Sequence, residues 1–131
     1  MNPDYSGTHR LNAAFQDRFV VVEMDYPKIK DEVKILAQKT GMKDEELLTK
    51  MVKVAHETRK EFRNEKITVT FSTRKLIFWA EMCRVFTPAK AFKYAVLNKL
   101  PKEDVKPVMD IASIIFPEPE FRNTLTYKER D

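Results

Sequence analysis

Residues 43–63, with the sequence KDEELLTKMVKVAHETRKEFR, decide the fold class of this chain. Apolar side chains recur there at spacings of three and four residues, which places them on one face of an α-helix. This face contains Leu47, Met51, Val54, Ala55, Thr58 and Phe62. Three acidic residues at positions 44–46 precede it and suit the positive end of a helix dipole. We therefore expect a long helix that buries one face in a core.

Helical patterns continue on both sides of this segment. Before it, Ile29, Val33 and Leu36 repeat at helical spacing and are followed by Gly41, a residue that commonly ends helices. After it, Ser72 is expected to cap a helix that runs to about Phe86. Further helices are predicted from residues 87–88 and after residue 101, and Pro107 is expected in the first turn of the last one. The expected inward-facing residues of these three helices are Leu76, Trp79, Ala80, Cys83, Ala91, Phe92, Ala95, Val96, Val105, Val108, Met109, Ala112 and Ile115.

Two segments lack a helical pattern. Residues 67–71 (ITVTF) alternate briefly and are predicted to be an extended connector. Residues 118–131 begin within the segment Pro117-Glu118-Pro119, are mostly polar, and are predicted to form a loose tail.

The amino-terminal residues have a different sequence pattern from the helical segments. Residues 11–17 indicate a short helix that ends at Arg18, and residues 19–24 (FVVVEM) form a nearly continuous β-branched run, typical of a strand covered on both faces. No comparable strand follows, although a lone strand cannot satisfy its own backbone groups. We therefore expect that its neighbouring strands are missing and that the sequence starts in the middle of a domain.

Composition limits the class of protein. The chain has 131 residues, of which 43% are hydrophobic and 34% charged, so it suits one soluble domain. No apolar run approaches the roughly 20 residues needed to cross a bilayer. Cys83 is the only cysteine, which excludes an intrachain disulfide and favours a reducing, cytoplasmic location. With only two glycines, the chain has no Gly-rich phosphate loop.

The net charge of +4 comes from 24 basic and 20 acidic residues that are interleaved along the chain. A nucleic-acid-binding protein usually gathers its basic residues on one face. The charge pattern therefore argues against nucleic-acid binding, which stays the weakest of the alternatives.

Arg74 is the most unusual of the candidate functional residues. It lies in the sequence Ser72-Thr73-Arg74-Lys75, where two cations occupy the first turn of a predicted helix. The helix dipole disfavours positive charge there, and a bound anion would reverse that penalty. A guanidinium can also grip phosphate oxygens with two hydrogen bonds. The alternative is an ordinary solvated arginine at a helix start.

Arg18 and Asn2 are two further candidates. Arg18 lies between a short helix and the predicted strand, where a cation at a helix end is also stable without a ligand. Asn2 lies in a turn, where its amide can orient a water molecule or simply cap the turn. His9 and His56 are far apart and have no cysteine or paired carboxylate at ligand spacing, so no metal site is expected. Cys83 falls on an apolar helix face, as a packing residue would.

Several segments together have a recognisable pattern. The amino-terminal segments are residues 1–8 (MNPDYSGT), 11–15 (LNAAF) and 17–19 (DRF), and the later ones are residues 26–27, 31–36, 71–80 and 89–104. They resemble the MoxR-type, dynein-related group of AAA+ ATPases, which includes chelatase subunits and activators of nitric-oxide reductase and Rubisco. The likeness covers about residues 1–116, and its first 25 residues are the most specific.

The resemblance implies a mainly α fold in three parts. Residues 1–26 would be a remnant, one short helix and one strand, of the α/β nucleotide-binding core, and residues 27–117 would be a helical AAA+ lid bundle, followed by the polar tail at 118–131. Asn2 would be the first sensor, which helps place the attacking water. Arg18 would be the arginine finger that reaches the neighbouring subunit's site. Arg74 would be the second sensor, which contacts nucleotide phosphates.

The resemblance also implies a function that this chain cannot perform alone. The complete protein would bind ATP and Mg²⁺, hydrolyse ATP in a ring, expected to be a hexamer, and remodel or activate a partner. The resemblance implies a partner with a von Willebrand factor A domain. The P-loop and the Asp-Glu strand for Mg²⁺ do not occur here, so this chain is expected to bind nucleotide weakly and to be inactive by itself. The alternative is a stand-alone helical interaction module without nucleotide chemistry.

Overall fold

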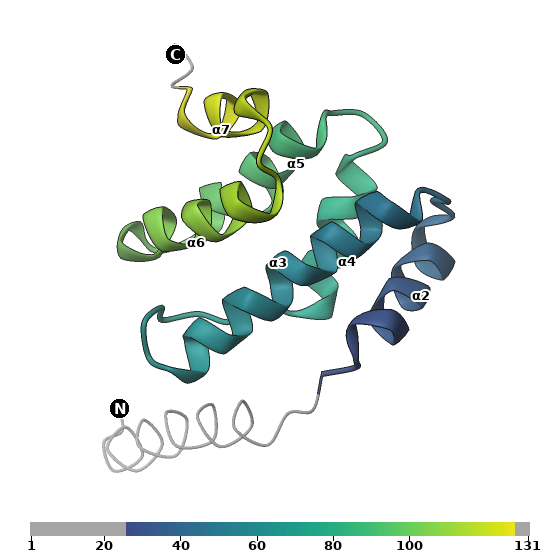
Figure 1. The fold of residues 1–131 in the computed structure, drawn as a ribbon, viewed down its shortest axis with the longest axis horizontal. Coiled ribbons are helices and arrows are strands. Elements are labelled where there is room, and N and C mark those ends of the chain that lie inside the picture. The colour runs from purple at the N-terminus through teal and green to yellow at the C-terminus, as the bar shows by residue number, and fades with distance from the viewer. Residues whose placement is uncertain (1–25, 128–131) are drawn as a thin grey trace, which may run out of the picture.

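The computed structural model describes residues 26–127, and within them the chain is helical with no strand (Figure 1). The elements are α2 (Ile29–Thr40), α3 (Glu45–Arg63), α4 (Thr73–Met82), α5 (Pro88–Ala95), the 3-10 helix η2 (Leu97–Lys99), α6 (Lys102–Ile115) and α7 (Pro119–Thr126). The expected mainly α class is confirmed for these residues. The predicted short helix and strand within residues 11–24 lie outside the described residues.

Helix α3 is the central element of the bundle. It packs against α2, α4 and α6, with α2 on its right and α6 on its left in Figure 1. The Asp44 side chain accepts a hydrogen bond from the backbone N–H of Leu47 at 3.1 Å and so caps the start of α3. Gly41 ends α2 with a φ of 75°, a left-handed conformation that suits glycine. Both predicted helix boundaries are confirmed.

Helix α4 starts as predicted but ends earlier than expected. The Ser72 hydroxyl accepts a hydrogen bond from the backbone N–H of Lys75 at 3.1 Å, which confirms Ser72 as the cap. The α-helix stops at Met82 rather than near Phe86. The backbone N–H groups of residues 83–85 bond to carbonyls three residues earlier, so the last turn tightens into a connection to α5.

Helix α7 contradicts the expectation of a loose tail. Phe121 and Leu125 are buried at a helical spacing of four residues, and α7 packs against α5 and α6. The Phe121 ring stacks on Phe116 with the ring centroids 4.5 Å apart. Two apolar residues in an otherwise polar segment are therefore enough to hold this helix, because the rest of the bundle supplies the aromatic surface.

The placement of Pro107 also differs from the prediction. Helix α6 begins directly after Pro101, so Pro107 lies inside the helix rather than in its first turn. A proline there has no N–H to donate to the carbonyl of Glu103. The helix nevertheless continues to Ile115 with Val108 and Ala112 buried in the core, so its packing outweighs the missing hydrogen bond.

Trp79 of α4 is the largest fully buried side chain between residues 26 and 127. Its indole N–H donates to the carbonyl oxygen of Pro88 at 3.1 Å, which joins α4 to the start of α5. Its ring lies 4.5 Å from Phe92 and 6.1 Å from Phe116, measured between centroids. These contacts fix the inner face of α4 in the core, whereas Arg74 at the amino terminus of this helix is exposed to solvent.

The connector between α3 and α4 is held at both ends. Ile67 and Phe71 are buried, and the buried Asp104 carboxylate of α6 accepts hydrogen bonds from the backbone N–H and the hydroxyl of Thr68. These contacts satisfy backbone and side-chain polar groups that would otherwise be costly to bury. These contacts therefore fix the connector and, with it, the position at which α4 begins.

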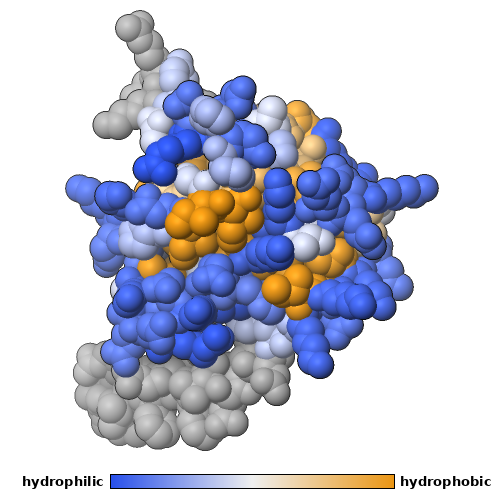
Figure 2. Space-filling view, in the orientation of Figure 1, coloured by the Kyte–Doolittle hydropathy of each residue, from blue (hydrophilic) through white to orange (hydrophobic). Residues whose placement is uncertain are grey.

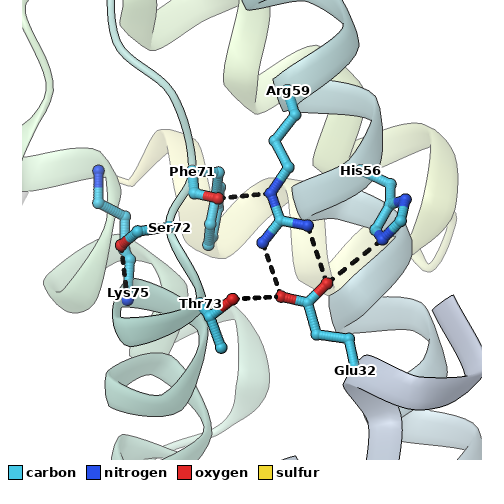
Figure 3. Close-up of polar contacts among 7 residues, drawn as sticks. All are labelled: Glu32, His56, Arg59, Phe71, Ser72, Thr73 and Lys75. Atoms are coloured by element: carbon cyan, nitrogen blue, oxygen red, sulfur yellow. Dashed lines mark hydrogen bonds and ion pairs between the residues drawn. The ribbon is translucent and has the colours of Figure 1, made fainter. Parts of the chain in front are cut away.

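A buried ion pair joins three helices next to the start of α4 (Figure 3). Glu32 of α2 and Arg59 of α3 are 0% and 2% exposed, and the two nitrogens Nη1 and Nη2 of Arg59 lie 2.8 and 2.7 Å from the two carboxylate oxygens of Glu32. Arg59 Nε donates to the carbonyl oxygen of Phe71 at 2.6 Å, and the Thr73 hydroxyl donates to Glu32 Oε2 at 2.8 Å. The pair thus fixes both residues that flank the cap of α4.

Two aromatic rings complete the surroundings of this pair. The guanidinium carbon of Arg59 lies 3.7 Å from the centroid of the Tyr26 ring, and His56 Nε2 lies 3.3 Å from Glu32 Oε1. Burial by itself would raise the pKa of Glu32, but the hydrogen bonds and positive charge of Arg59 outweigh it and hold the pKa below the ordinary value of 4.5. Glu32 is therefore ionised in the folded protein near neutral pH.

Removal of one partner should destabilise the domain strongly. We expect Arg59→Met to lower the free energy of unfolding by about 3–5 kcal/mol, because Glu32 is then buried without a partner. Chemical denaturation followed by circular dichroism measures this change. Lys106→Gln, which breaks the exposed pair between Lys106 and Asp110, is the control and should change the value by about 0.5 kcal/mol or less. The double variant Glu32→Leu/Arg59→Met should recover part of the loss, and a cost under about 1 kcal/mol for the single variant would contradict this account.

Stability should also depend on pH through Glu32. Because the folded state lowers the pKa of Glu32, its carboxylate stabilises the fold above pH 4.5, and this contribution is lost as the pH falls through the lowered folded pKa. The difference in unfolding free energy between the natural chain and Glu32→Gln should therefore be constant near neutral pH and shrink as the pH falls below 4.5. Denaturation curves of both proteins from neutral to acidic pH measure it. A difference that stays constant would show that the charge of Glu32 does not matter.

Candidate functional site

The amino terminus of α4 carries the sequence-predicted residue Arg74. Arg74 is the second residue of the helix and is exposed, and among residues 26–127 its guanidinium has no hydrogen-bond or ion-pair partner. No acidic residue lies in the first turn to balance it. The preceding residue, Thr73, is tied to Glu32, so the backbone that carries Arg74 is fixed while its side chain reaches solvent.

Two lysines increase the positive charge at this end of α4. Lys75 is half-buried, and burial together with the nearby positive charge of Lys99 lowers its pKa. Lys75 Nζ lies 5.7 Å from the centroid of the Phe71 ring, and Lys99 Nζ lies 4.3 Å from that of Phe78. The 3-10 helix η2 therefore brings a cation from a distant part of the sequence toward the start of α4.

This arrangement is chemically suited to an anion. The first backbone N–H groups of a helix lack partners within the helix, and Ser72 satisfies the one at Lys75. The N–H groups of the first turn, the helix dipole and the guanidinium of Arg74 would all favour a negatively charged group. The Thr73 hydroxyl is already bonded to Glu32 and so is not a free donor for such a group.

The other predicted site residues cannot be placed beside Arg74. Asn2 and Arg18 lie outside the described residues. Sequence reasoning also missed the buried pair of Glu32 and Arg59 and the contribution of Lys99. One signal for Arg59 was present, because it follows Ala55 by four residues and precedes Phe62 by three, on the face predicted to be buried.

Other chemistries find little support in the described part of the chain. Residues 26–127 contain no group of three or more potential metal-ligating side chains. Cys83 packs against the core, and burial raises the pKa of its thiol to about 11, so the reactive thiolate is scarce at neutral pH. No helix in this range is both long and apolar enough to span a lipid bilayer.

An apolar groove forms a second surface feature. It has a volume of about 410 Å³ and lies between the start of α2, the middle of α3 and the end of α6. Its lining includes Ile29, His56, Ile111, Ile114 and Ile115, and the Ile114 side chain is 77% exposed. Figure 2 shows that apolar areas interrupt an otherwise hydrophilic face of the molecule. Apolar surface of this kind is typical of protein contacts.

Comparison with known proteins bears on residues 32–114, which match the family model described as CbbQ/NirQ/NorQ C-terminal. The aerobic cobaltochelatase subunit CobS of Sinorhizobium is 39% identical over 101 residues, which are 72% of this chain and 30% of that protein. The uncharacterized protein YojN of Bacillus subtilis is 26% identical over 118 residues, 88% of this chain and 39% of YojN. An uncharacterized protein of Staphylococcus haemolyticus is 28% identical over 107 residues.

The matched segment contains the elements described above. It starts at Glu32, includes Arg59, Thr73 and Arg74, and ends at Ile114 in α6. The chain spans only 30–40% of the length of these relatives. On this evidence the chain belongs to the CbbQ/NirQ/NorQ carboxy-terminal family and is the helical carboxy-terminal portion of a MoxR-type AAA+ protein.

Proposed function

We propose that this chain is the lid-containing part of an AAA+ ATPase that couples ATP binding and hydrolysis to the remodelling or activation of a partner protein. The observation that carries the proposal is the exposed Arg74 guanidinium at the amino terminus of α4, inside the segment that the family matches. A cation held there on a fixed backbone is suited to the phosphates of a nucleotide.

In this proposal the nucleotide is held mainly by polypeptide other than this chain. The sequence has no P-loop motif, so ATP and Mg²⁺ would be bound by that other part, and Arg74 would act as the second sensor. Bound Mg²⁺ would neutralise phosphate charge during phosphoryl transfer to water. Arg74 would contact the phosphates, and its attachment to α4 would make the position of the lid depend on the nucleotide.

Two residues outside the described part have proposed roles that rest on the sequence motif alone. Asn2 would orient the attacking water as the first sensor. Arg18 would be the arginine finger, which stabilises charge on the phosphoryl group in the neighbouring subunit. A finger acts across a subunit boundary, so the proposal includes a ring, expected to have six members. A partner with a von Willebrand factor A domain and a cytoplasmic location belong to the same proposal.

A stand-alone interaction module is the second candidate function. The observation that favours it is the apolar groove with the exposed Ile114, which has the character of a protein-contact surface. In that case Arg74 would be an ordinary solvated side chain, and nucleotide would change nothing. The two candidates therefore differ in whether substitution of Arg74 affects nucleotide-dependent behaviour.

The Arg74 prediction requires an ATPase that contains this chain, either the complete protein or a cobaltochelatase subunit in which this chain replaces the matching segment. We expect Arg74→Ala to lower ATP turnover about tenfold and to weaken ATP-dependent assembly, because one phosphate contact is lost. A phosphate-release assay and analytical ultracentrifugation measure the two effects. Arg84→Ala removes an exposed arginine beyond the far end of α4 and is the matched control. If both properties survive in Arg74→Ala, the second-sensor role is excluded and the interaction module is favoured.

The Arg18 prediction separates catalysis from binding in the same ATPase. We expect Arg18→Ala to lower kcat by a factor of about 10³ while leaving nucleotide affinity unchanged, because the finger acts on the transferring phosphoryl group of a neighbouring subunit. Single-site titration with a fluorescent ATP analogue and steady-state turnover give the two quantities. Arg10→Ala is the control in the same segment. Normal turnover in Arg18→Ala would rule out the finger assignment.

A further inference from the structure

We propose that the buried pair of Glu32 and Arg59 mechanically couples the anion-contacting turn of α4 to Tyr26, the residue through which the chain enters the lid. This inference rests on the proposed contact between Arg74 and phosphate. It assigns Arg59, Glu32 and Thr73 as positioning residues, which act through Arg74 and do not touch the nucleotide themselves.

One end of the coupling is the start of α4. Arg59 Nε binds the carbonyl oxygen of Phe71, and Glu32 Oε2 accepts a hydrogen bond from the Thr73 hydroxyl at 2.8 Å. These two residues flank the capping residue Ser72, and Arg74 follows directly. A displacement of the Arg74 backbone must therefore either break a hydrogen bond at the buried pair or move the pair with it.

The other end is the aromatic ring of Tyr26. This residue lies three positions before the start of α2, and its ring packs face-on against the buried guanidinium at 3.7 Å. The attraction between a cation and the face of an aromatic ring depends on their separation, so a shift of the guanidinium would change the surroundings of the Tyr26 ring. Tyr26 is half-buried and lies at the edge of the domain, unlike the core residues around Trp79. Figure 3 shows the polar part of this path, from Thr73 through Glu32 to Arg59.

The stiffness of the path follows from its chemistry. The planar guanidinium and the carboxylate form two parallel hydrogen bonds of 2.8 and 2.7 Å in a site that excludes solvent. Breaking either bond would leave a buried charge poorly compensated, which costs far more than a small rotation of the whole unit. Anion binding at Arg74 is therefore transmitted to Tyr26 and, through it, to the polypeptide that precedes the lid.

The chain itself is sufficient for the test, with sodium tripolyphosphate as the probe. Nuclear magnetic resonance would follow the backbone amide of Arg74 as the binding reporter and the labelled ring of Tyr26 as the remote reporter, with sodium chloride at equal ionic strength as the reference. In the natural chain both signals should shift with the same apparent Kd. In Arg74→Ala the apparent affinity reported by the backbone amide of residue 74 should fall about tenfold, and the Tyr26 response should weaken with it. A Tyr26 shift that keeps its natural apparent Kd in Arg74→Ala would reflect local binding at the nearby exposed Lys28 or Lys30 and would overturn the coupling.

Thr73 supplies the decisive pair of variants. Thr73→Val removes the hydrogen bond to Glu32 with little change in shape, and should reduce the Tyr26 shift at saturation about twofold or more while the Arg74 amide still responds. Thr73→Ser keeps the hydroxyl and should retain the Tyr26 response. Thr58→Val removes a buried hydroxyl that bonds only within α3, and is the matched control for stability. Melting temperatures of all variants show whether the fold is intact.

The outcomes separate the coupling from the proposed function. If tripolyphosphate shifts Arg74 but not Tyr26 in the natural chain, the coupling is wrong and the anion contact stands. If Thr73→Val leaves the Tyr26 shift unchanged, the path through Glu32 is likewise wrong. If Arg74 does not respond to tripolyphosphate at all, the proposed phosphate contact fails and the coupling fails with it.

Discussion

The ion pair between Glu32 and Arg59 is the constraint on which the arrangement of α2, α3 and α4 depends. A carboxylate and a guanidinium buried without solvent are tolerated only when their hydrogen-bonding groups find partners. Here Arg59 is bonded through Nε, Nη1 and Nη2, and Glu32 also receives the Thr73 hydroxyl. Each of these partners lies on a different element, so the requirement to satisfy the two charges sets the positions of the elements relative to one another.

At the start of α4, unlike at the buried pair, no acidic residue in the first turn compensates the positive charge. Arg74 and Lys75 lie where the helix dipole disfavours positive charge, and burial and the charge of Lys99 lower the pKa of Lys75. The fold accepts this unfavourable electrostatic arrangement although no acid in the first turn relieves it. An anion would remove the repulsion and use the free N–H groups at the same time. The charges of Glu32 and Arg59 are thus compensated within the fold, whereas Arg74 has no acidic residue in its helical turn, and the proposed anion contact rests on this contrast.

Local patterns made most of the helices predictable. The apolar face of α3, Gly41 after α2 and the Ser72 cap of α4 are all encoded within a few residues, and each was confirmed. Helix α7 was missed because Phe121 and Leu125 gain their stability from the distant rings of Phe92 and Phe116. The strand at residues 19–24 and the sites at Asn2 and Arg18 stay predictions.

The candidate site was also predictable only in part, because some of its contacts join residues that are far apart in the sequence. Arg74 stood out because its conflict with the helix dipole is local. Glu32 and Arg59 are 27 residues apart, and neither position shows which charged residue will be its partner. Only the helical spacing of Arg59 with Ala55 and Phe62 indicated that an arginine would face the core.

The combination of a rigid backbone and an exposed guanidinium has a consequence for how a lid can respond to nucleotide. If Arg74 were on a flexible loop, a phosphate contact would be absorbed by local movement and nothing else would change. Because Thr73 is fixed to α2 and Trp79 is fixed in the core, α4 has no such freedom. In the proposed second-sensor role, a force on Arg74 that exceeds the reach of its own side chain would therefore be passed to the elements packed around α4, and through them a single cation would act as a switch.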